Sequence, residues 1–138
     1  MPNKTQPIEH LVRELEERAK ELNCLYRIED TLNHSDISFD EAFNHVVDAI
    51  PPGWQFPDIT RVKLEYKGNT YTTEHFTESL WFQRADIKVN DEIVGHISVY
   101  YIKPVRDYDE GPFLKEERKL LNTISERLSH FILHKDTF

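Results

Sequence analysis

The clearest pattern of hydrophobic and polar positions lies in the stretch from Leu80 to Ile102, where it predicts a long β-hairpin. In the first arm, Ala85, Ile87 and Val89 alternate with charged residues, which is the period of a strand with one buried face. The alternating apolar residues of the second arm are Ile93, Ile97, Val99 and Tyr101. Helices and shorter strands are expected to pack against this hairpin.

The length of the turn decides which residues of the two arms face each other. A two-residue loop at 90–91 would place Ile97 opposite Arg84 and mix the two faces. A three-residue loop at 90–92 places Ile97 opposite Ala85, so that the apolar residues share one face. Because strand register follows the buried face, we expect the three-residue loop.

A helical pattern predicts a long N-terminal helix over residues 8–32, and the polar residues 1–7 before it are expected to be disordered. The apolar positions of this helix follow a heptad seam: Ile8, Leu11, Leu15, Leu22, Leu25 and Leu32. Two interpretations are open. The seam packs on the chain's own sheet, or its first half meets a second copy of the chain. In the second case the chain is a homodimer, with these interface residues: Ile8, Leu11, Leu15 and Leu22.

The remaining segments complete one domain over residues 1–138. Ser38 and Glu41 have the spacing of a capping box and predict a second helix, which Pro51 ends. Strands are then expected at 60–66 and 70–73, and a last helix from about Leu114. This order predicts an α+β fold, with an antiparallel sheet and the N- and C-terminal helices packed mainly on one face.

Composition narrows the class of protein. The net charge of −8 argues against sequence-independent binding of nucleic acid, which requires neutralised phosphates. No segment approaches the roughly 20 apolar residues that cross a bilayer, and the first ten residues lack the apolar stretch of a signal peptide. The single cysteine, Cys24, excludes an internal disulfide framework. We therefore expect a cytoplasmic protein with neither nucleic-acid nor membrane partners.

The sequence contains no strong catalytic or metal-binding motif. His130 and His134 have a spacing that can hold a metal, but no third ligand is evident, and exposed histidines near a helix end are the simpler interpretation. Cys24 lies among apolar residues and is expected to be a buried, inert thiol. His75 and His96 are possible general bases without a recognisable nucleophile. We expect no catalytic residue, no metal and no cofactor.

Aromatic residues gather at the entry to the first strand and along the hairpin. In the expected register, Phe82 faces Tyr100 on one side of the sheet. These residues either pack in an ordinary way or line a small apolar pocket on the face away from the helices, roofed by the 73–79 loop. The candidate ligand-binding residues are Trp54, Phe56, Trp81, Phe82 and Tyr100.

Four segments, 21–32, 50–60, 85–101 and 110–128, together resemble a compact GAF-like sensory domain. The related domains stand beside sensor histidine kinases and ahead of phosphoenolpyruvate-synthase-like and pyruvate-phosphate-dikinase-like modules. The resemblance implies a non-enzymatic regulatory domain whose terminal helices dimerise and pass signals to a neighbour, such as a downstream kinase or phosphotransfer domain. It supplies no ligand residues.

Three hypotheses follow from these observations. The first is a sensory or regulatory module that acts through helix-mediated dimerisation and optionally binds a small ligand. The alternatives are a purely structural protein-interaction domain and a small enzyme that uses a histidine near the aromatic cluster. An enzyme needs polar groups that converge in a cleft, whereas a sensor needs a cavity and a mobile roof.

Overall fold

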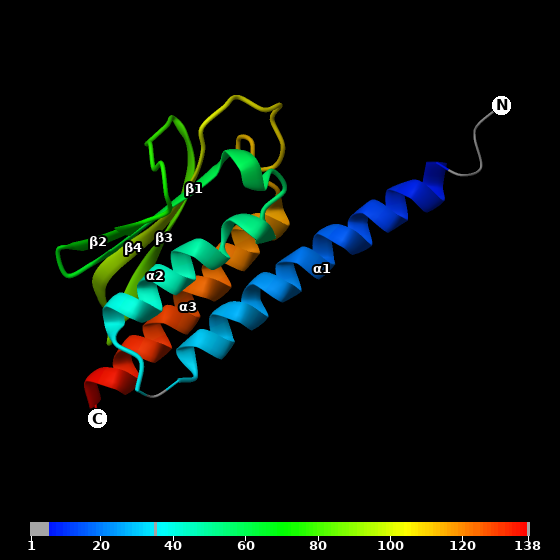
Figure 1. The fold of residues 1–138 in the computed structure, drawn as a ribbon. Coiled ribbons are helices and arrows are strands. Elements are labelled where there is room, and N and C mark those ends of the chain that lie inside the picture. Colours follow the sequence, from blue (N-terminus) through cyan, green and yellow to red (C-terminus); the bar gives the residue numbers. More distant parts are fainter. Residues whose placement is uncertain (1–5, 35, 138) are drawn as a thin grey trace.

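The computed structural model describes residues 6–34 and 36–137 and has an α+β fold (Figure 1). Its helices are α1 (Gln6–Leu32), α2 (Phe39–Ala49) and α3 (Lys115–Thr137), with short 3₁₀ turns η1 (Pro51–Gly53) and η2 (Pro57–Ile59). Its strands are β1 (Thr60–Tyr66), β2 (Asn69–Thr72), β3 (Trp81–Val89) and β4 (Glu92–Tyr101). Residues 1–5 of the segment expected to be disordered lie outside the described residues, and α1 already begins at Gln6.

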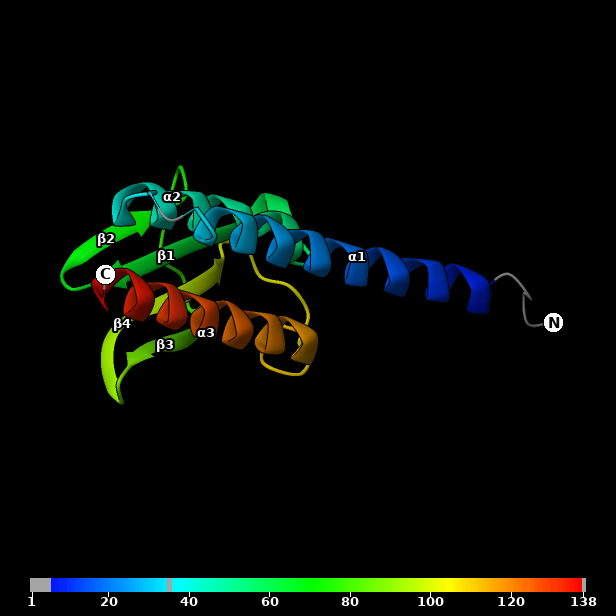
Figure 2. The same cartoon turned by 90° about the horizontal axis from the view of Figure 1, so that it is seen from below.

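The four strands form one antiparallel sheet in the order β2-β1-β4-β3. One face of this sheet is buried along its length, as the alternation in β1 predicts: Thr60, Val62, Leu64 and Tyr66 are all buried. Helix α2 packs on β1 and β2, and α3 packs on β3 and β4. The helices thus cover one face, and the terminal helices lie side by side (Figure 2).

Helix α2 begins where the capping box places it. The Ser38 hydroxyl accepts a hydrogen bond from the Glu41 N–H at 3.1 Å, which satisfies one of the amide groups left open at a helix start. The predicted apolar face of this helix is fully buried: Ala42, Phe43, Val46, Val47 and Ile50. The local sequence and the tertiary packing therefore agree over this segment.

The predicted pairing of β3 with β4 is confirmed over most of the hairpin. Ala85 faces Ile97, and Phe82 faces Tyr100. The turn itself differs from the prediction, because the structure has a two-residue loop of Asn90 and Asp91.

Both loop residues have positive φ, 53° and 66°, which is the backbone of a type I′ turn. A bulge then leaves Val94 without a partner in β3 and restores the predicted pairing farther along the strands. The bulge also changes the exposure of the residue before it. Ile93 is 55% exposed, so the prediction that it belongs to the buried face was wrong.

Helix α1 forms a third layer outside α2 and α3. Cys24 and Ile28 are buried and join the hydrophobic core, whereas residues 7–16 are all exposed. Figures 1 and 2 both show this first part of α1 extending beyond the sheet. Within residues 6–34 and 36–137, no helix combines the length and the apolar character that a membrane crossing requires.

The register predicts a sharp difference between two isoleucines of β4. Ile97 is fully buried, so Ile97→Ala should lower the free energy of unfolding by about 2–5 kcal/mol, through lost burial and a residual cavity. Ile93→Ala is the matched control and should change it by less than about 0.5 kcal/mol. Urea unfolding followed by circular dichroism measures both, and equal losses would contradict the observed faces.

Candidate functional site

The face of α1 that points away from the domain carries a regular apolar seam. Its residues are spaced alternately four and three apart: Ile8, Val12, Leu15, Ala19, Leu22 and Tyr26. All of them are exposed, including Leu15 at 60% and Leu22 at 69%. This is the a/d spacing of a coiled coil, and we call these residues the α1 seam.

The α1 seam only partly coincides with the predicted one. The expected interface residues are all exposed: Ile8, Leu11, Leu15 and Leu22. Leu25 and Leu32, however, are half-buried against the core. The exposed seam therefore runs through Val12 and Tyr26, which the sequence reading missed because two heptad patterns share residues 8, 15 and 22.

Arg18 falls on a heptad position of the predicted seam, between Leu15 and Leu22, but it does not fall on the α1 seam, which has Ala19 there. Its guanidinium lies 2.9 Å from the Glu21 carboxylate and 3.8 Å from that of Glu116 on α3. The side chain is thus directed toward the domain. No charged residue interrupts the α1 seam between Ile8 and Tyr26.

The structure divides the predicted ligand-binding residues between two faces of the sheet. Trp54 is fully buried on the helix side, where its indole N–H donates to Gln83 Oε1 at 2.8 Å. Phe56 packs edge-on against Tyr101 on the same side, at 5.8 Å between ring centroids. Trp81 faces Tyr101 across the hairpin and is half-buried.

Phe82 and Tyr100 lie on the opposite face, away from the helices. The connection between β2 and β3 does reach over this face, where Phe76 packs edge-on against Tyr100 at 5.4 Å. Phe82 contacts the same ring at 5.5 Å. The chain thus places its own phenylalanine against Tyr100, where the prediction places a ligand. The five candidates do not line one pocket.

A buried carboxylate that the sequence reading missed lies at the start of α3. Glu117 is 1% exposed and accepts hydrogen bonds from the Gln55 and Leu114 N–H groups, both at 2.8 Å, and from the Tyr101 hydroxyl at 3.2 Å. Burial raises the pKa of Glu117 above its ordinary value, although the three donors act in the opposite direction. A signal was present, because Glu117 falls on the apolar stripe between Leu114 and Leu121.

A second polar cluster ties the connection before α3 to the sheet. Arg118 makes two charge-assisted hydrogen bonds to Glu110, at 2.7 and 2.8 Å, and a third to the Arg84 carbonyl at 2.8 Å. Arg118 lowers the pKa of Glu110 below its ordinary value. The Gln83 amide donates to the same carboxylate at 3.3 Å and so joins this cluster to Trp54.

The polar groups of both clusters have partners within the chain. The oxygens of Glu117 accept from donors that hold three separate segments together, which is a structural arrangement. Burial raises the pKa of the Cys24 thiol to about 12, so the nucleophilic thiolate is disfavoured. His96 contacts Asp86 at 3.0 Å on the outer face of the sheet, where both side chains are partly exposed.

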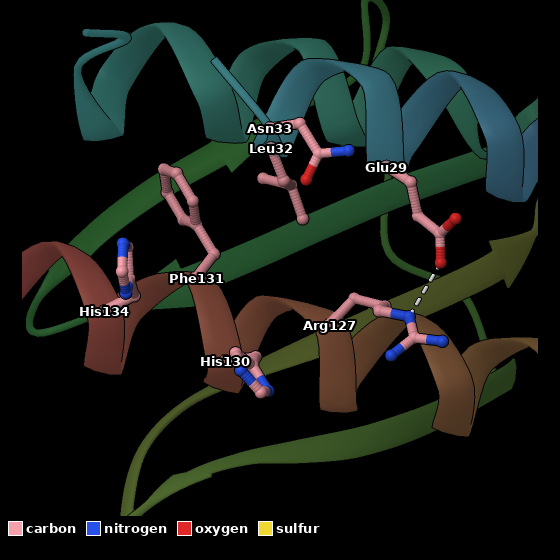
Figure 3. A pocket seen from close by; sticks show the side chains of 7 residues that line it. All are labelled: Glu29, Leu32, Asn33, Arg127, His130, Phe131 and His134. Atoms are coloured by element: carbon pink, nitrogen blue, oxygen red, sulfur yellow. Dashed lines mark hydrogen bonds and ion pairs between the residues drawn. The ribbon is translucent and has the colours of Figure 1, made fainter. Parts of the chain in front are cut away.

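A groove lies between the end of α1 and the second half of α3 (Figure 3). Its volume is about 390 Å³, and it is lined by Glu29, Leu32, Asn33, Arg127, His130, Phe131 and His134. We call it the α1–α3 groove. Arg127 Nε donates to Glu29 Oε1 at 2.7 Å across it. The structure thus brings both histidines into one groove.

The groove does not have the donor set of a metal centre. In the part of the chain that the structure describes, no three histidine, cysteine, aspartate or glutamate side chains are arranged to hold a metal ion.

Comparisons with protein-family models, with curated proteins and with solved structures found no match. Function therefore has to be inferred from the geometry of the chain itself.

The buried position of Glu117 predicts a pH-dependent effect of Glu117→Gln. Glutamine keeps one acceptor oxygen and adds an N–H₂ group, so at least one buried donor loses its partner, at a cost of about 1–3 kcal/mol. Because the pKa of Glu117 is raised in the folded state, the wild type loses stability as pH rises above 4.5. The variant lacks this loss, so the difference in free energy of unfolding between the two proteins should narrow as the pH rises above 4.5.

Urea unfolding at several pH values measures this difference, with Glu126→Gln, at an exposed position of the same helix, as the control. A difference that widens with rising pH would mean that the three donors outweigh burial.

Proposed function

We propose that this chain is a non-enzymatic regulatory module of the GAF-like type that dimerises through α1. The observation that carries the proposal is the α1 seam, a heptad pattern of exposed apolar side chains on a helix whose second half packs its other side against the domain. An α+β fold with terminal helices that lie together agrees with the proposal. The proposed neighbour is a kinase or phosphotransfer domain, as the resemblance implies.

Burial of the α1 seam against a second copy supplies the driving force for dimerisation. Each large apolar side chain gains about 1.5–3 kcal/mol when it is fully removed from water, and Ile8, Leu15 and Leu22 are each more than half exposed. The a/d spacing lets these residues insert between residues of a facing helix over several turns. A second copy of the same helix offers the matching spacing.

The position of α1 leaves space for that second copy. Cys24 and Ile28 hold the helix against α2, α3 and η1, and they lie on the side opposite the seam. In a two-helix coiled coil the bodies of the two copies would therefore lie on opposite sides of the helix pair, where they do not obstruct each other.

Charge favours a parallel arrangement. With Val12 at an a position, Glu9 and Glu16 occupy e positions beside the seam. Antiparallel helices bring the e positions of both copies to the same edge, so these glutamates would face one another. Parallel helices bring e positions against g positions, so Glu16 would face Leu11 and not another glutamate.

Two ion pairs connect the proposed interface to the C-terminal helix. Arg18 contacts Glu116 at 3.8 Å, and Arg127 contacts Glu29 at 2.7 Å, so both halves of α3 are linked to α1. A change in the position of α1 within a dimer would therefore be transmitted to both halves of α3 through these ion pairs. This is the route by which we propose that the module passes a signal.

The double variant Leu15→Lys/Leu22→Lys tests the dimer. Two lysines in the seam leave buried charges without partners, so the mass measured by light scattering should fall to that of the monomer. Leu80→Lys is the matched control, because Leu80 is 89% exposed and lies outside the seam. A wild-type protein that is already monomeric would overturn the proposal.

A cysteine at position 8 tests the orientation. In a parallel dimer the two copies of residue 8 are adjacent, so Ile8→Cys should form a disulfide-linked dimer under mild oxidation. In an antiparallel dimer the two positions lie at opposite ends of the helix pair. The wild type is the control, since its single thiol, Cys24, is buried. Dimers that resist cross-linking in Ile8→Cys would contradict the parallel arrangement.

A further inference from the structure

The α1–α3 groove contains an arginine whose binding capacity is only partly used. Arg127 donates from Nε to Glu29, and its two terminal nitrogens have no partner among the residues that the structure describes. Figure 3 shows these two nitrogens turned away from the Glu29 carboxylate. The ion pair thus orients the guanidinium and leaves its forked edge open, which is the edge that binds a carboxylate with two hydrogen bonds.

The floor of the groove is apolar. Leu32 from α1 and Phe131 from α3 line it, and both are half-buried and packed against the core. The Phe131 ring is held edge-on by Phe39, at 5.8 Å between centroids, and so presents a fixed aromatic surface. Such a surface favours the flat or aliphatic part of an organic molecule over water.

The rim of the groove contains further polar groups from both helices. Asn33 at the end of α1 and His130 on α3 each offer hydrogen-bonding groups. The one carboxylate in the lining, Glu29, is already compensated by Arg127. The pair neutralises Arg127 as well, so the lining favours an anion through the unused terminal N–H donors of Arg127 and not through a net charge.

We infer that the α1–α3 groove binds a small organic carboxylate with an apolar body. The carboxylate pairs with the terminal nitrogens of Arg127, and the apolar body lies on Leu32 and Phe131. A volume of about 390 Å³ suits a molecule of that kind. Inorganic phosphate has the charge but would leave the apolar floor uncovered. The site differs from the aromatic residues expected from the sequence, which lie on the sheet.

Benzoate is the probe, compared with benzamide, which has the same shape without the charge, and with inorganic phosphate, which has the charge without the apolar part. Titration is followed by the NMR signals of the Arg127 Nε–H and the His130 ring. We expect saturable shifts with benzoate and binding of benzamide and phosphate that is weaker by roughly tenfold or more, because charge-assisted hydrogen bonds and apolar contact are both needed.

Arg127→Gln should abolish the preference for benzoate over benzamide. The variant should fold, because Arg127 and Glu29 are about half exposed and such pairs contribute little to stability. Arg13→Gln, an exposed arginine of α1 outside the groove, is the control and should retain the preference. For the variant the readout is the His130 ring signal.

Four results would overturn the inference: no saturable shift with benzoate, equal binding of benzamide, equal binding of phosphate, or an unchanged preference in Arg127→Gln. All residues that line the site belong to one chain. Leu15→Lys/Leu22→Lys should therefore still give saturable shifts with benzoate, so failure of the ligand site and failure of the dimer are separate outcomes.

Discussion

A helix that is apolar on two sides must bury both or leave one in water, and α1 is such a helix. One side, through Cys24 and Ile28, is covered by the helices of its own domain. The other side, the α1 seam, is covered by nothing within the described chain. The sheet, α2 and α3 would keep their core without the seam. The heptad spacing is therefore better explained by contact with another helix than by the needs of this fold.

Polar side chains between segments hold the rest of the domain in place. Glu117 joins the turn at Gln55, the strand residue Tyr101 and the start of α3. A buried carboxylate is costly unless its oxygens are satisfied, and here three donors satisfy them. Arg118 makes two hydrogen bonds to Glu110, a partly exposed carboxylate at the edge of the sheet. These contacts fix the connection before α3 to the scaffold and thereby fix where α3 runs.

The sequence predicted those features that depend on a single buried face. The pairing of Ala85 with Ile97 follows from alternation alone, and it was correct. The length of the turn was predicted incorrectly, because a two-residue loop and a bulge at Val94 together give the same pairing as a three-residue loop. Periodicity shows which residues of each strand share the buried face, but it does not show the length of the turn or the position of a bulge. The same limit applies to α1, where two overlapping heptads fitted the pattern and only packing could select the one through Val12.

The proposed groove and the proposed interface lie on one continuous path along α1. The next a and d positions after Tyr26 are Glu29 and Asn33, and both line the groove. The seam therefore becomes polar where the groove begins. A carboxylate bound by Arg127 would change the charge beside Glu29, at the first position beyond the apolar seam. A ligand shifts an association only if it binds the associated and separate forms unequally. This shared boundary is where such a difference would arise.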